Sequence, residues 1–116
     1  MQGVDPSVPP SGTGCADCDT ADPQGWWFHL RRCAECGHIG CCDSSPGQHA
    51  SAHAEAAGHR IVRSFEPGEE WFWDYGEQAM YESGPELAGP AHRPLTQSVP
   101  GPADRVPEDW TQRLHQ

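Results

Sequence analysis

The sequence predicts a small domain of short strands and one main helix, in which an apolar core alone gives little stability. The chain has 116 residues, of which 13 are Gly and 12 are Pro, and 35% are hydrophobic. Short stretches rich in β-branched and aromatic residues alternate with turn residues, and helix signals are concentrated near the middle. Most prolines lie near the two ends, so we expect an ordered region at 15–82, where an apolar core is marginal.

Four stretches are typical of strands, and we expect them at 26–30, 38–41, 61–65 and 70–75. In the first, alternation places Trp26, Phe28 and Leu30 on one face, which is the better candidate for the core. In the last, alternation places Trp71, Trp73 and Tyr75 on one face.

One helix is expected at 45–57. Ser45 can cap it, Pro46 suits the first helical position, and Gly58 fits the position just beyond the last turn. The segments 1–14 and 83–116 are poor in apolar residues and rich in proline, so we expect them to be flexible tails.

Eight cysteine and histidine residues recur at spacings typical of metal ligands. The pattern C-x2-C-x14-C-x2-C-x4-C-x7-H-x3-H-x5-H is formed by Cys15, Cys18, Cys33, Cys36, Cys41, His49, His53 and His59. Two closed tetrahedral zinc sites require eight such ligands. Structural zinc contributes about 10–16 kcal/mol in small finger peptides, so the metal-free chain should be largely unfolded. With every position filled by protein, no catalytic water can bind, and the chain is not expected to be an enzyme.

Disulfide bonding is the main alternative use of the six cysteines. The N-terminus has neither a basic segment nor an apolar segment of a secretory signal, and no stretch is long enough to span a membrane. Histidines at ligand spacing also have no role in a disulfide scaffold. We therefore expect a cytoplasmic, zinc-binding protein that does not associate with membranes.

The charge balance argues against nucleic-acid binding. The formal net charge is −10 at pH 7. Such a surface repels phosphate backbones, which bind proteins through clustered Lys and Arg. A reactive-thiol enzyme using Cys42 near His38 is also not expected, because no third group is apparent that could orient such a pair. Cys42, His38 and His29 are instead expected beside the metals or at the surface.

The chain resembles the UBP-type zinc finger of ubiquitin-specific proteases and a histone deacetylase. The resemblance rests on the first C-x2-C pair, the run from Trp26 to His38, Gly40-Cys41, the helical H-x3-H pair and Gly58-His59. It covers about 15–75 and is strongest with small, free-standing bacterial members. It implies an α+β fold, with a small twisted antiparallel sheet packed on one main helix.

The resemblance also implies how the ligands divide between two zinc ions, which the spacing alone leaves open. One site would contain Cys15, Cys18, Cys41 and His49, and the other Cys33, Cys36, His53 and His59. Some members hold a third zinc with a later cysteine pair. This chain has Phe72 and Tyr75 there, so we expect two ions.

Another departure concerns ubiquitin. Ubiquitin-binding members carry Cys-Gly-Arg, and the Arg holds the C-terminal carboxylate of ubiquitin, whereas this chain has Cys41-Cys42-Asp43. Because Asp43 would repel a carboxylate, the usual mode of ubiquitin recognition is not expected.

The aromatic residues near position 73 match the wall of the family's binding pocket, although in a small domain they could equally fill the core. An aromatic cleft beside Asp43 would suit a cationic or polar group. We expect a monomeric module that binds a protein or peptide tail; the alternative is a structural or regulatory adaptor acting through its flexible tails. The candidate binding residues are Asp43, Arg60, Arg63, Trp71, Trp73 and Tyr75, with one of the two arginines supplying positive charge.

Overall fold

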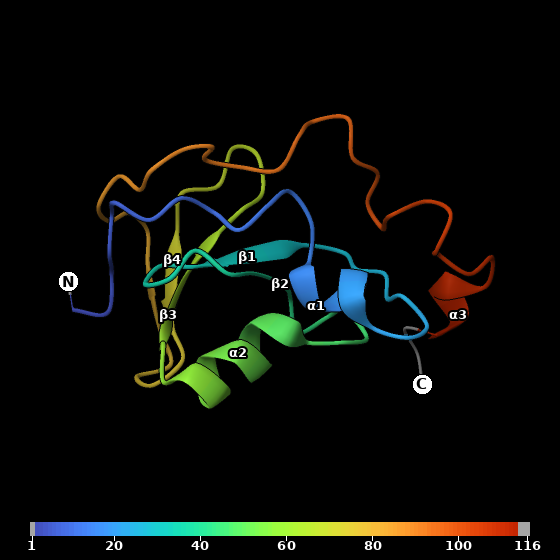
Figure 1. The fold of residues 1–116 in the computed structure, drawn as a ribbon, viewed down its shortest axis with the longest axis horizontal. Coiled ribbons are helices and arrows are strands. Elements are labelled where there is room, and N and C mark those ends of the chain that lie inside the picture. Colours follow the sequence, from blue (N-terminus) through green and yellow to red (C-terminus); the bar gives the residue numbers. More distant parts are fainter. Residues whose placement is uncertain (1, 114–116) are drawn as a thin grey trace.

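A five-stranded antiparallel sheet forms the centre of the protein (Figure 1). The structure, a computed structural model, describes residues 2–113. Its strand order is β2-β1-β3-β4-β5. The elements are α1 (Ala16–Thr20), β1 (Leu30–Cys33), β2 (Ile39–Cys41), α2 (His49–Ala57), β3 (Ile61–Ser64), β4 (Phe72–Asp74), β5 (Ala79–Tyr81) and α3 (Trp110–Arg113). The expected α+β fold, with an antiparallel sheet and one main helix, is confirmed.

The main helix, α2, begins later than the sequence predicts. Its N-cap is Gln48, which adopts a left-handed conformation and makes no side-chain cap. Ser45 does not cap the helix, because its hydroxyl accepts a hydrogen bond of 2.9 Å from the backbone N–H of Phe28. The predicted end is correct, since Gly58 follows the last turn with φ of 72°, a conformation in which Gly carries no steric cost.

The first strand also begins later than expected, which changes the core. Residues 26–29 do not join the sheet as a strand; Trp27 forms an isolated bridge with Gly101. The indole of Trp27 is 5% exposed and packs among the buried residues around Leu30, while Trp26 and Phe28 stay half-buried. The prediction of Trp26 and Phe28 as core residues is therefore wrong, because the alternation it relied on holds only within a regular strand.

Helix α2 covers one face of the sheet at the β1 and β2 end (Figure 1). The closest approach is at Gly40 on β2, where an added Cβ would lie 2.7 Å from the backbone nitrogen of Ala50. Only Gly therefore allows the helix backbone to lie this close to the strand. The strand register places Arg31 opposite Gly40, so the side chain of Arg31 shares this face.

The two terminal segments cover the opposite face. In Figure 1 the N-terminal segment and the segment after β5 run along the side of the sheet away from α2. Val4 and Leu87 pack against Ile61 and Phe72. Backbone hydrogen bonds of 2.8 Å join Asp5 N–H to the Ala34 carbonyl, and Ala88 N–H to the Pro6 carbonyl.

Arg32 links both segments to the sheet. Its side chain is 1% exposed. One terminal nitrogen donates to the Val8 carbonyl at 2.7 Å and to the Ala88 carbonyl at 2.6 Å, while the other donates to the Pro90 carbonyl at 3.3 Å. Burial, together with the nearby charge of Arg63, lowers the pKa of Arg32.

These contacts differ from the flexible tails that the sequence predicts. The boundaries 1–14, 15–82 and 83–116 stay a prediction, and residues 1 and 114–116 lie outside the described part. In residues 2–113, however, both terminal segments make defined contacts with the domain. Composition could not reveal this, because the carbonyls that Arg32 binds belong to backbone and carry no sequence signal.

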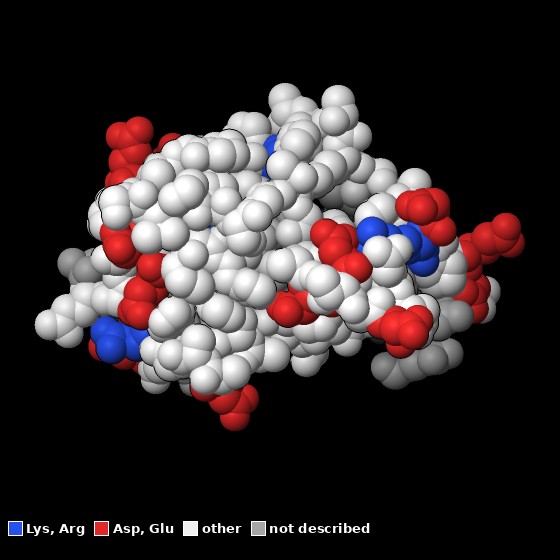
Figure 2. All heavy atoms as spheres, in the orientation of Figure 1, with Lys and Arg blue, Asp and Glu red and all other residues white. Residues whose placement is uncertain are grey.

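Acidic side chains are spread over the surface (Figure 2). On the face shown, basic groups are fewer than acidic ones and some of them lie next to acidic groups, in keeping with the net charge of −10. Arg105, for example, pairs with Asp19 at 2.9 Å. Within residues 2–113, no helix has the length and apolar character needed to cross a membrane.

Candidate metal centres and the adjoining pocket

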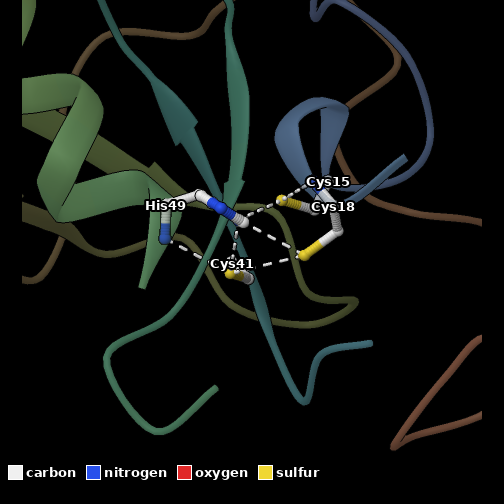
Figure 3. A group of neighbouring side chains, drawn as sticks. All are labelled: Cys15, Cys18, Cys41 and His49. Carbon is white, nitrogen blue, oxygen red and sulfur yellow. Dashed lines mark hydrogen bonds between the residues drawn. The ribbon is translucent and has the colours of Figure 1, made fainter. Parts of the chain in front are cut away.

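The first cluster of ligands, which we call site 1, joins α1, the end of β2 and the start of α2 (Figure 3). The Nδ1 atom of His49 lies 3.3 Å from the sulfurs of Cys15 and Cys18, and 3.4 Å from that of Cys41. The sulfurs of Cys18 and Cys41 are 3.9 Å apart. Three separate elements thus bring four donor atoms close together.

Local structure holds the site 1 sulfurs in place. Cys15 is the N-cap of α1, and its sulfur accepts a hydrogen bond of 3.4 Å from the backbone N–H of Cys18. The sulfur of Cys41 accepts one of 3.3 Å from the backbone N–H of His49. Gly25 leaves room for the sulfur of Cys18, since an added Cβ would lie 2.9 Å from it. The backbone N–H groups that donate to the sulfurs of Cys15 and Cys41 favour the thiolate form, which is the form that binds metal.

The second cluster, site 2, lies where β1 and β3 meet α2 and contains Cys33, Cys36, His53 and His59. The sulfur of Cys36 is 3.3 Å from Nε2 of His53, and that of Cys33 is 3.5 Å from Nδ1 of His59. The second ring nitrogen of His59 lies 2.8 Å from a carboxylate oxygen of Glu35. A carboxylate on the far nitrogen is a common support for a metal-binding histidine, because it fixes the ring orientation.

Both clusters have the donors and dimensions of a tetrahedral zinc site. Around a zinc ion with bonds of about 2.0–2.3 Å, neighbouring ligand atoms are separated by roughly 3.3–3.8 Å. In each cluster the four candidate atoms lie within 4.8 Å of one another, and the closest pairs match this separation. The two clusters therefore fit two zinc ions, with the membership that the resemblance implied, and the predicted cofactor is confirmed.

The protein environment shifts the pKa values of several ligands in different directions. Hydrogen bonds with Cys15 and Cys18 lower the pKa of Cys41 to about 3, whereas hydrogen bonds with Cys15 and Cys41 raise the pKa of Cys18. Burial raises the pKa of Cys33 to about 11. Burial, with repulsion from neighbouring histidines, lowers the pKa of His53 and so favours the neutral, metal-binding ring. A bound cation is what would hold several such sulfurs as thiolates at neutral pH.

Of the three residues that the sequence left outside the metal sites, His38 and Cys42 lie beside ligands, whereas the ring of His29 contacts Glu66. Nε2 of His38 is 2.7 Å from a carboxylate oxygen of Asp17, and its ring stacks on His53 with centroids 4.3 Å apart. The ring of His29 bonds to Glu66 at 3.0 Å. Cys42 is 5% exposed, and its sulfur lies 3.4 Å from the hydroxyl of Ser45.

An open cavity of about 260 Å³, the aromatic pocket, lies on the α2 face of the sheet. Its walls include Arg31, Asp43, Trp71, Trp73, Tyr75 and Met80. The three aromatic side chains are half-buried, and Met80 is 60% exposed. The sequence left open whether these aromatic residues fill the core or line a cleft, and the structure places them around a cleft beside Asp43.

The basic residue in the aromatic pocket is one that the sequence analysis missed. Arg60 and Arg63 do not line it; Arg60 pairs with Asp74 at 3.0 Å, and Arg63 binds the Ala91 carbonyl at 3.1 Å. Arg31 lines it instead, with its guanidinium carbon 4.6 Å from the centre of a Trp71 ring. The sequence did contain one sign of this position: Arg31 lies two residues before the metal ligand Cys33, so the two side chains share one face of the strand.

The polar groups of the aromatic pocket surround Tyr75. Burial raises the pKa of Tyr75 to about 12; the charge of Asp43 adds to this shift and that of Arg31 opposes it. Tyr75 therefore presents a neutral hydroxyl at physiological pH. Asp43 is exposed, and within residues 2–113 its carboxylate makes no ion pair, with Arg31 or any other residue.

Residues 15–86 match the family described as the zinc finger of ubiquitin hydrolases and other proteins. The chain belongs to this UBP-type zinc finger family. The domain is also similar to protein RPA1320 from Rhodopseudomonas palustris, whose structure was determined by NMR in solution. The two chains are 41% identical with a TM-score of 0.59, and the match covers 75% of this chain and 86% of the other. Among curated proteins, none matches significantly.

The two zinc sites of this UBP-type finger differ in exposure, so we expect a chelator to remove zinc from site 2 first. Cys15, Cys18 and Cys41 are 0% exposed, whereas Cys36 is exposed and both histidines of site 2 are half-buried. Chelators attack the accessible ion more readily. Cobalt-substituted protein gives the measurement, because a three-sulfur site and a two-sulfur site have different absorption spectra. Loss of the three-sulfur spectrum before the other would contradict the prediction.

Proposed function

We propose that this zinc finger is a non-enzymatic module that binds a protein or peptide tail in the aromatic pocket. The observation that carries the proposal is the open cavity of about 260 Å³, which has half-buried aromatic walls and lies beside the loop between the site 1 ligands Cys41 and His49. Buried aromatic side chains with a few polar groups are typical of binding pockets. A cavity of this volume can accommodate the last one or two residues of a peptide chain, but not a folded domain.

The zinc chemistry supports a binding role over catalysis. Each cluster provides four protein ligands, so a zinc ion bound there has no open position for water or substrate. Cys42 is buried, and its sulfur contacts the hydroxyl of Ser45, which is not a base that could activate a catalytic thiol. The zinc ions therefore act by holding the pocket in shape.

The alternative, an adaptor that acts through its tails, has less support. Within residues 2–113 the terminal segments cover the sheet and bond to Arg32, so much of their backbone is already occupied. A partner would have to displace these contacts before it could bind the tails.

Titration of the zinc-loaded protein with ubiquitin and with synthetic C-terminal peptides, followed by tryptophan fluorescence, tests the proposal. The Trp71→Ala variant should keep both zinc ions and the fold, because Trp71 is half-buried and packs on Arg31 rather than in the core. We expect its affinity for a bound tail to fall at least tenfold, which is about 1.4 kcal/mol.

A matched control is Trp26→Ala, which also removes one half-buried indole but lies outside the aromatic pocket. This variant should bind tails as the unaltered protein does. No fluorescence change with any tail, or unfolding of Trp71→Ala, would remove the support for the proposal.

A further inference from the structure

A second hollow shares Tyr75 with the aromatic pocket. This helix hollow, of about 400 Å³, lies between α2 and the end of β4 and is lined by residues that include Ala54, Glu55 and Arg60. Tyr75 forms part of the wall of both cavities. A ligand in the aromatic pocket that is longer than one or two residues therefore has an adjoining space to enter.

The charges along these cavities are not balanced. Arg60 is neutralised by Asp74, whose carboxylate also accepts hydrogen bonds from the backbone N–H groups of Gly76 and Glu77. Within residues 2–113, the carboxylates of Asp43 and Glu55 have neither an ion-pair partner nor a side-chain hydrogen bond. Each of the two cavities that share Tyr75 is therefore lined by one unpaired carboxylate.

In the part of the chain that the structure describes, Arg31 is the one cationic side chain that lines the aromatic pocket, and it already lies against Trp71. It does not pair with Asp43 although both line the same cavity. A ligand that satisfies both must carry an anionic and a cationic group. A peptide tail has the first in its terminal carboxylate, and a Lys or Arg side chain supplies the second.

We infer that the two cavities form one track for a basic protein tail, with the cationic side chains of the tail facing Asp43 and Glu55. This rests on the proposed function and specifies its ligand class. Aromatic faces and carboxylates together attract Lys and Arg side chains through cation–π and ionic contacts. The net charge of −10 adds long-range attraction for a positively charged partner.

Two fluorescent eight-residue tails test the inference. Both have a free C-terminal carboxylate; one has lysines at alternate positions, and the other has glutamines at the same positions. The lysine tail should bind the zinc-loaded protein about tenfold more tightly at low salt. This advantage should shrink as salt is added, because exposed charges are screened.

The variants Asp43→Asn and Glu55→Gln locate the effect. Each should reduce the preference for the lysine tail several-fold while the affinity for the glutamine tail changes little. Asp104→Asn is the matched control, because it removes the same charge from an exposed residue that lines neither cavity. It should leave the preference unchanged.

The possible results separate the inference from the function on which it rests. Equal binding of the two tails overturns the inference and leaves tail binding intact. The inference is also overturned if Asp104→Asn reduces the preference for the lysine tail as much as Asp43→Asn and Glu55→Gln do. The net negative charge of the protein, rather than the two cavities, would then select the tail. No binding of either tail, or of any tail in the titrations above, overturns both.

Discussion

We expect removal of zinc to unfold this protein. A strong chelator should release two equivalents of zinc per chain and abolish the fixed environment of Trp27, whose buried indole packs in one cluster with the three cysteines of site 1. Each structural ion contributes about 10–16 kcal/mol in small finger peptides, which is as large as the whole stability of an ordinary domain. Circular dichroism and tryptophan fluorescence follow the loss, and added zinc should reverse it.

Single cysteine variants show which sulfurs hold the metal. Cys18→Ser should bind one zinc ion fewer and lose most of its cooperative unfolding, because Cys18 is a fully buried site 1 ligand. Cys42→Ser is the matched control, since Cys42 is also buried but lies outside both clusters. It should bind two ions. A metal-free chain that keeps its native spectra would refute the view that zinc holds this fold together.

Loss of the Arg32 side chain is the second large effect we expect. Arg32→Ala leaves a cavity under the terminal segments and removes the donors of three carbonyls, those of Val8, Ala88 and Pro90. The free energy of unfolding of the zinc-loaded protein should fall by about 3 kcal/mol, measured by urea denaturation. Hydrogen exchange at the amides of Asp5 and Ala88, which bond across the same region, should become faster.

Arg31→Ala is the control for this variant. Arg31 is the preceding residue of β1, but it is half-buried and points to the opposite face, so its removal should cost less than 1 kcal/mol. If Arg32→Ala were as stable as Arg31→Ala, with unchanged exchange, the terminal segments would be as loose as their composition predicts.

The parts of this protein that could be read from sequence depend on local spacing. A C-x2-C turn brings two sulfurs to one point whatever surrounds it, so the ligand set was recognisable before the fold was known. Gly58 ended α2 where expected, because the left-handed conformation beyond a helix depends on that residue alone. The division of the ligands between two metals needed the family resemblance, since spacing allowed His49 and His53 to share one ion.

Contacts between distant segments decided the rest. Trp27 rather than Trp26 entered the core because Gly101, far along the chain, bridges to it. Arg31 entered the aromatic pocket because the register of β1 with β2 and β3 turned it toward α2. The terminal segments, poor in apolar residues, are held by backbone carbonyls that meet Arg32. The residue types and their spacing were enough to predict metal binding. Which residues line the aromatic pocket, and which charges face it, depends on contacts between distant segments that no local pattern encodes.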